Sequence, residues 1–133
     1  MRSRSVERTR YGVFLDRATE FLDAAQDCRS RGHHQAAVSN AVHAAIAAVD
    51  AVTVFHAGKR SVPQRHEDAV HLLGMLGLPE SEVEPRARQL RRLLGLKTKA
   101  EYTDDLVTAH EAEGSVQDAE RLVAWAKKRV GRP

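Results

Sequence analysis

Cysteine, proline and aromatic residues are scarce in this sequence, with one cysteine, four prolines and 5% aromatic residues among 133. The single cysteine, Cys28, excludes an internal disulfide and cannot by itself build a thiolate metal site. No stretch reaches the roughly 18 uncharged apolar residues that a membrane span needs. The first ten residues, MRSRSVERTR, lack the apolar run of a secretory signal. We therefore expect a cytoplasmic protein that does not contact a membrane.

Motifs of the common catalytic and cofactor sites are also missing. No segment shows sustained strand alternation, so a glycine-rich phosphate loop or a strand-borne serine nucleophile has no scaffold. HExxH does not occur, and His66 and His71, two of the seven histidines, are five residues apart and do not share a helix face. These patterns predict no metal site, no cofactor and no catalytic residue.

The composition is typical of a folded domain. Hydrophobic residues make up 42% of the chain and charged residues 29%. A chain of 133 residues fits one domain and buries about two thirds of its unfolded surface. The net charge of +3 fits an arginine-rich composition, and nucleic-acid binding is the alternative explanation.

Apolar residues recur at three- and four-residue spacing along five segments, which predicts an all-α protein, a compact up-and-down bundle of about five helices in a single domain, 1–133. The predicted helices span 6–31, 33–56, 61–76, 81–102 and 108–130. The second is apolar on almost every side, which predicts that it is the central helix. We expect one chain to leave part of it uncovered, and this favours a homodimer.

Three Ser/Thr-x-x-Gln/Glu patterns predict helix starts with capping boxes. They are Ser61–Gln64, Ser81–Glu84 and Thr108–Glu111. Glycine follows four of the five segments, at positions 32, 58, 77 and 131, as expected where a helix ends. The caps and the periodicity agree, which strengthens the prediction of helices.

Three polar residues of the second helix, Asn40, His43 and Asp50, fall within about 80° of one another on a helical wheel. This sector either faces water or forms a polar cleft or a polar seam between two copies. A carboxylate on so apolar a helix needs a cation or a hydroxyl beside it. We therefore hypothesise that Asp50 and His43 meet Lys97, Lys99 or Tyr102 in one cleft suited to a phosphate or a nucleotide.

The fourth segment carries a run of cations. Arg88, Arg91 and Arg92 lie on or beside the helix face that also holds Lys99. This face is either solvated or directed at the phosphates of a nucleic acid. Tyr102 is the one aromatic residue near it, so a platform for stacking bases is not indicated.

Three pieces of the sequence together resemble the HEPN domain family over roughly residues 10–130. The alanine-rich AVSNAVHAAIAAVDAVTVFHAG resembles the family's central helix, and QRHEDAVHLLGML resembles its histidine-containing third segment. The third piece, RRLLGLKTKAEYTD followed by AEGSVQDAERLVAWAKKRV, is similar to the family's basic-x-x-Ala-x-Tyr junction and closing helix. The resemblance implies a helical dimer, and many members are ribonucleases that act as toxins or defence effectors.

The ribonuclease members use an Arg-x(4–6)-His motif near the junction of the fourth and fifth helices. Lys97 and Lys99 stand here where the arginine is expected, and Glu101-Tyr102 stands where the histidine is expected. Arg60…His66 and Arg65…His71 have the right spacing but lie between the second and third segments, so we interpret them as chance. A general acid or base at the junction is therefore missing.

The sequence thus predicts a non-catalytic HEPN-like binding module. Its expected partners are a second copy of the chain together with RNA, a nucleotide or another protein, within a toxin–antitoxin or stress-response system. Two alternatives remain open. One is a HEPN-type ribonuclease with an atypical active site, and the other is a structural bundle that binds only proteins.

Overall fold

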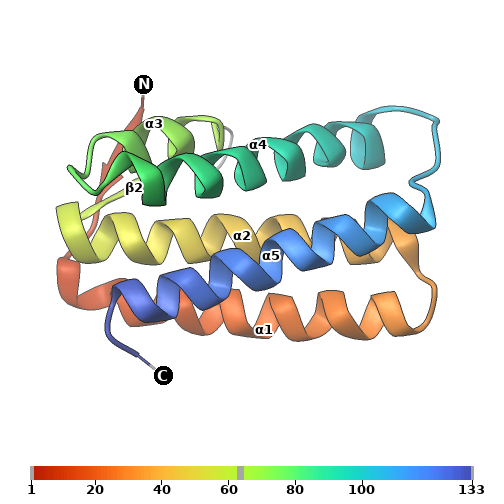
Figure 1. Cartoon of the computed structure of the whole chain (residues 1–133), viewed down its shortest axis with the longest axis horizontal. Coiled ribbons are helices and arrows are strands. Elements are labelled where there is room, and N and C mark those ends of the chain that lie inside the picture. The colour runs from red at the N-terminus through yellow and green to blue at the C-terminus, as the bar shows by residue number, and fades with distance from the viewer. Residues whose placement is uncertain (1, 63–64, 133) are drawn as a thin grey trace.

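The computed structural model describes residues 2–62 and 65–132, and shows four long helices side by side with a short helix and a two-stranded sheet at one end (Figure 1). In chain order the elements are β1 (Ser3–Ser5), the 3-10 turn η1 (Arg8–Arg10), α1 (Tyr11–Ser30), α2 (His34–Ala57), β2 (Lys59–Ser61), α3 (Asp68–Gly74), α4 (Glu80–Tyr102) and α5 (Ala109–Arg129). The predicted all-α helical bundle is confirmed.

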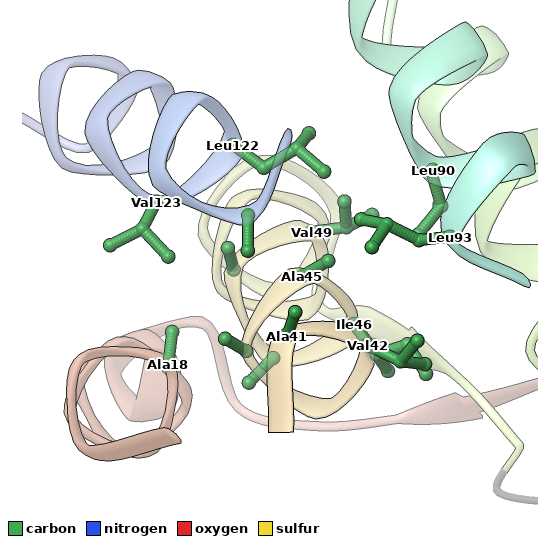
Figure 2. Packing of buried hydrophobic residues seen from close by; sticks show 14 of the residues in the cluster. Ala18, Ala41, Val42, Ala45, Ile46, Val49, Leu90, Leu93, Leu122 and Val123 are labelled. Atoms are coloured by element: carbon green, nitrogen blue, oxygen red, sulfur yellow. The ribbon is translucent and has the colours of Figure 1, made fainter. Parts of the chain in front are cut away.

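Helix α2 is the central helix, as its apolar sequence predicts. Figure 2 views it end-on, with Leu122 and Val123 of α5 on one side and Leu90 and Leu93 of α4 on another. The helix ends at Gly58, which adopts a left-handed φ of 65° and donates its N–H to the carbonyl one turn earlier. Its observed bounds differ from the predicted ones by one residue at each end.

The expectation that one chain leaves an apolar face of α2 uncovered is wrong. Fifteen of its 24 residues are buried by α1, α4, α5 and the small sheet of the same chain. The many alanines of α2 allow these neighbouring elements to approach closely, so they cover the helix from solvent without a second copy of the chain. By length and hydropathy α2 could cross a membrane, but 78% of its apolar window is buried inside the bundle, as in the core helix of a globular domain.

The small sheet is a feature that the sequence does not predict. Strands β1 and β2 pair antiparallel, with Ser3 opposite Ser61 and Ser5 opposite Lys59. A backbone hydrogen bond from Val6 to Gly58 continues this pairing. Strands of three residues are too short to show an alternating pattern, which is why the sequence indicates none.

Two of the three predicted capping boxes do not form. Ser61 belongs to β2 and α3 begins only at Asp68, while Gln64 lies outside the described residues. Helix α4 begins at Glu80, with Pro79 at the N-cap and Ser81 already inside the first turn. The third box is present, because Thr108 and Glu111 exchange hydrogen bonds of 3.0 and 3.1 Å at the start of α5.

Candidate functional site

Asp50 on α2 is a carboxylate with only 2% of its surface exposed. Its Oδ1 accepts hydrogen bonds from the backbone N–H and the hydroxyl of Ser61, at 3.4 and 3.3 Å. Arg60 Nε lies 3.8 Å from Oδ2, which makes an ion pair but is too long for a hydrogen bond. Burial raises the pKa of Asp50 to about 6, although Arg60 and Ser61 act in the opposite direction. Asp50 therefore fastens β2 to the central helix.

The residues of α4 that were expected beside Asp50 have other partners. Lys97 Nζ pairs with Glu101 Oε2 at 3.3 Å and lies 5.4 Å from the centre of the Tyr102 ring. The ion pairs and hydrogen bonds found within the described ranges connect Asp50 to β2 and not to Lys97, Lys99 or Tyr102. The structure thus separates the contacts of Asp50 from those of the α4 residues.

The remaining residues of the expected cleft occupy separate environments. Lys99 Nζ donates to Glu111 Oε1 at 2.9 Å, which ties the end of α4 to the start of α5. The side chain of Asn40 donates to the backbone oxygen one turn earlier in α2, at 2.9 Å. His43 is exposed on α2, and its ring centre lies 5.1 Å from that of Phe21 on α1. Of these three, His43 remains available to a ligand.

A cavity of about 510 Å³ lies between the start of α3 and the C-terminal half of α4. Its lining includes His66, Lys97, Thr98 and Tyr102 together with the apolar positions Leu94 and Gly95. The volume falls within the range of small-molecule sites, roughly 300–1,000 Å³. Two of the residues predicted to bind a ligand, Lys97 and Tyr102, therefore share a cavity with His66.

His66 is the functional candidate that sequence reasoning missed. It is partly buried, and its Nδ1 has no hydrogen-bond partner in the part of the chain that the structure describes. Burial lowers the pKa of His66, and the positive charges of Lys97, His43 and Arg60 lower it further, against a smaller effect of Glu67. The imidazole is thus neutral at pH 7, and His43 and Lys97 are close enough to act on the same ring.

The spacing Arg60…His66 is the signal in the sequence that points to this site. From the sequence we interpret this spacing as chance, because the two residues lie before the third helix and not at the junction of α4 and α5. The fold places that connection beside α4, so residues of the connection and of the junction line one cavity. Arg60 itself is held by Asp50 and lies 4.9 Å from the ring centre of Phe14.

The cations of α4 outside the cavity are largely paired. Arg92 donates to both carboxylate oxygens of Asp118 on α5, at 3.0 and 2.9 Å, which holds the two helices together. Arg88 and Arg91 lie 4.0 and 3.8 Å from Glu84, in exposed pairs that contribute little to stability. Arg88 and Arg91 can exchange this partner for a phosphate, whereas Arg92 has a structural role.

The imidazoles near the cavity do not form an evident metal site. Across residues 2–62 and 65–132, no group of three or more His, Cys, Asp or Glu side chains is arranged to hold a metal ion. The cavity instead combines a lysine, a histidine, a hydroxyl and an aromatic ring, which are groups that contact phosphates and bases.

Comparison with known proteins agrees with this fold. The model of the HEPN domain family matches residues 11–130. A protein of Methanocaldococcus jannaschii named "Putative toxin MJ0605" is 27% identical over 123 residues, which cover 87% of this chain and 85% of the relative. The family match extends over nearly all of the bundle, from the first residue of α1 to the end of α5, and the chain therefore belongs to the HEPN domain family.

Proposed function

We propose that this HEPN protein is a cytoplasmic RNA-binding module of a toxin–antitoxin or stress-response system, acting without strong catalysis. The observation that carries the proposal is the set of cations along α4: Lys97 lines the cavity, and Arg88 and Arg91 stand in exposed pairs on the same helix. Cationic groups along one helix attract the phosphates of a nucleic acid. The name of the archaeal relative supports a toxin–antitoxin context.

Weak or absent ribonuclease activity follows from the junction of α4 and α5. Glu101 and Tyr102 occupy the place where the family's ribonucleases carry histidine, and Tyr102 is 73% exposed. A ribonuclease with an atypical centre is the second candidate. The observation in its favour is His66, since a neutral imidazole beside a lysine has the composition of an acid–base site.

Incubation of the pure protein with total RNA at low and at higher salt tests these functions together. We expect binding that weakens with salt, and no cleavage comparable to that of HEPN toxins. Replacing Lys97 by glutamine should reduce the slope of log K against log[salt] by about 0.7, the value for one contact to a single strand. Lys128→Gln, at an exposed position of α5, is the matched control and should leave the slope unchanged.

The same assay separates the alternatives. Robust cleavage that is lost on changing Lys97 or Tyr102 would support the ribonuclease. An absence of both binding and cleavage at low salt would favour a bundle that binds only protein partners.

We also propose a homodimer, on the basis of family membership alone, because α2 is covered by its own chain. Light scattering at micromolar concentration should give about twice the chain mass of 14.7 kDa. A stable pair would bury more than about 1,000 Å² in total. A mass equal to that of one chain would contradict the dimer without affecting the RNA proposal.

A further inference from the structure

We propose that a cavity between the N-terminal half of α4 and the C-terminal half of α5 is a docking site for an acidic segment of a partner protein that also carries an apolar side chain. The two helices run antiparallel, which brings these halves side by side (Figure 1). The cavity has a volume of about 370 Å³, and it is lined by Arg86 from α4 and by Arg121, Ala124, Trp125 and Lys128 from α5. It does not include the cations that we propose for RNA, so the inference goes beyond the proposed function.

The four lining residues of α5 lie on one face of the helix. Positions 121, 124, 125 and 128 follow the spacing of three and four residues that brings side chains together on a helix surface. The row from Arg121 to Lys128 is about 10 Å long, with a cation at each end and with alanine and tryptophan between them. Arg86 adds a third cation from α4. The cavity therefore has an apolar centre and a basic rim.

The positive charges of this rim are not balanced by short contacts to carboxylates within the described ranges. Arg121 Nη1 lies 3.7 Å from Asp118 Oδ1, which already accepts a shorter hydrogen bond from α4. Arg86 Nη1 donates to the neutral amide of Gln89 at 3.0 Å. Lys128 is exposed, and the ion pairs of the described residues do not include it. A carboxylate from a partner therefore meets three cations with little competition.

Glu82 of α4, which contacts the tryptophan of the cavity, is already neutralised. Its Oε1 accepts a hydrogen bond from Trp125 Nε1 at 2.8 Å, and its Oε2 accepts one from Arg129 at 3.1 Å. Because the indole N–H is occupied in this way, the ring offers the cavity only apolar surface. The cavity between α3 and α4 is flanked by Glu67 and Glu101, whereas no carboxylate among the described residues lines this one.

The tryptophan favours a protein ligand over RNA. Trp125 is only 9% exposed, so its ring cannot stack on a base as the 73% exposed ring of Tyr102 can. It contributes instead to the apolar lining of a small cavity, which suits a side chain such as leucine. An apolar centre with a polar rim, anchored by tryptophan and arginine, is the pattern of protein–protein interfaces. The charge of the rim requires that the partner carry carboxylates.

Fluorescence anisotropy with a labelled synthetic helix tests the site on the full chain. The probe is a peptide of about 15 residues with leucine along one face and glutamate on both flanks, long enough to be partly helical. We expect it to bind at least about tenfold more tightly than the same peptide with glutamine in place of glutamate, and more weakly as salt is added. Replacing its leucines by alanine should weaken binding by at least about tenfold, because the apolar contact is lost.

Two substitutions at Ala124, an exposed position of α5 within the lining, separate charge from shape. Ala124→Glu places a carboxylate among the three cations and should weaken binding of the probe by at least about tenfold. Ala124→Gln has nearly the same shape and is the matched control, which should bind the probe at least about fivefold more tightly than Ala124→Glu. Glutamate and glutamine are both good helix formers, so loss of folding is not expected.

The variants of the RNA assay show whether the two sites are independent. Lys128→Gln should weaken binding of the probe by about two- to fivefold, since it removes one exposed charge contact, and should leave the salt slope of RNA binding unchanged. Lys97→Gln should have the reverse effect on the two ligands.

The peptide outcomes decide the site itself. Probe binding that Ala124→Glu does not weaken would place the peptide elsewhere and overturn the site. Equal binding of the glutamate and glutamine peptides would overturn the role of the cations. An alanine peptide that binds as tightly as the leucine peptide would overturn the docking of an apolar side chain and leave only attraction between charges.

The RNA outcomes separate this inference from the proposed function. Loss of RNA binding in Ala124→Glu, without binding of the probe to the wild type, would assign these cations to RNA, overturn the docking site and leave the proposed function intact. Probe binding without RNA binding would support the docking site and overturn the proposed function. Binding of neither ligand would overturn both proposals.

Discussion

Replacing Leu93 by alanine is expected to lower the free energy of unfolding by about 3 kcal/mol. Leu93 is fully buried on α4 and packs beside Leu90 against the central helix, near Val49 (Figure 2). The change removes apolar contacts and leaves a cavity, and the rigid helices around the site close it only in part. Because α4 also carries Lys97 and Tyr102, the same variant should bind RNA less tightly.

Urea denaturation followed by circular dichroism measures this loss as a lower midpoint at an unchanged m-value. Leu106→Ala is the control, because Leu106 is 78% exposed and its removal should change stability by less than about 0.5 kcal/mol. A loss of less than about 1 kcal/mol for Leu93→Ala would show that α4 packs on α2 more loosely than the structure indicates.

The helices were predictable because their signals are local. The apolar periodicity of α2 and the glycine at position 58 define its extent within one residue, and Gly58 does adopt the left-handed conformation that ends a helix. Likewise, the capping box of Thr108 and Glu111 lies within one turn of α5 and needs no distant partner. Signals of this kind depend on neighbours in the sequence, so the sequence alone reveals them.

The small sheet and the start of α3 depend on distant contacts and could not be predicted. Strand β1 pairs with a segment more than 50 residues away, and no pattern within three residues identifies such a partner. Ser61 has the sequence context of a helix cap, but its hydroxyl and N–H bond the buried carboxylate of Asp50 instead. A buried acceptor outcompetes the local cap because an unpaired buried carboxylate is costly.

The site was predictable only in part for a related reason. The high cost of burying a carboxylate indicated that Asp50 needs a cation or a hydroxyl beside it. The structure supplies Arg60 and Ser61, in place of the hypothesised Lys97, Lys99 or Tyr102. Which element supplies them depends on the path of the chain after α2. The place of His66 in the cavity depends on the same connection, which has no helical periodicity to guide a prediction.

Replacing Asp50 by asparagine is expected to raise the free energy of unfolding at pH 7.5, by about 2 kcal/mol. Burial raises the pKa of Asp50 from 3.8 to about 6, so the ionised form is disfavoured in the folded state. One pKa unit corresponds to about 1.4 kcal/mol, so the gain in the free energy of unfolding has an upper value of about 3 kcal/mol. The pKa of about 6 already includes the opposing effects of Arg60 and Ser61. The expected gain is smaller than this upper value because the amide nitrogen of asparagine is a poorer neighbour for the Arg60 guanidinium than a carboxyl oxygen, while the amide oxygen can still accept the hydrogen bonds of Ser61.

The sign of the pH dependence follows from proton binding. Between pH 3.8 and about 6 the folded state holds the Asp50 proton more often than the unfolded state does. The stabilisation by this proton is therefore complete below pH 3.8 and is lost as pH rises through about 6. The difference between Asp50→Asn and the wild type should be small at about pH 4 and reach its full value near pH 7.5. The pKa values of Asp68 and Glu111 are lowered, so these two groups make stability rise with pH in the wild type and in the variant alike. The effect of Asp50 is therefore measured as the difference in stability between the variant and the wild type.

Asp118→Asn is the matched control, since Asp118 is also a buried carboxylate but receives two short hydrogen bonds from Arg92. Arg92 is 57% exposed along its side chain, so breaking this pair should lower stability by about 1 kcal/mol. If the two variants change the free energy of unfolding in opposite directions at pH 7.5, the partners of a buried carboxylate, and not its burial alone, decide whether it stabilises the fold. If Asp50→Asn instead destabilises the protein at pH 7.5 and not at about pH 4, the ion pair with Arg60 outweighs the cost of burying the Asp50 carboxylate, and β2 is held to α2 mainly by charge.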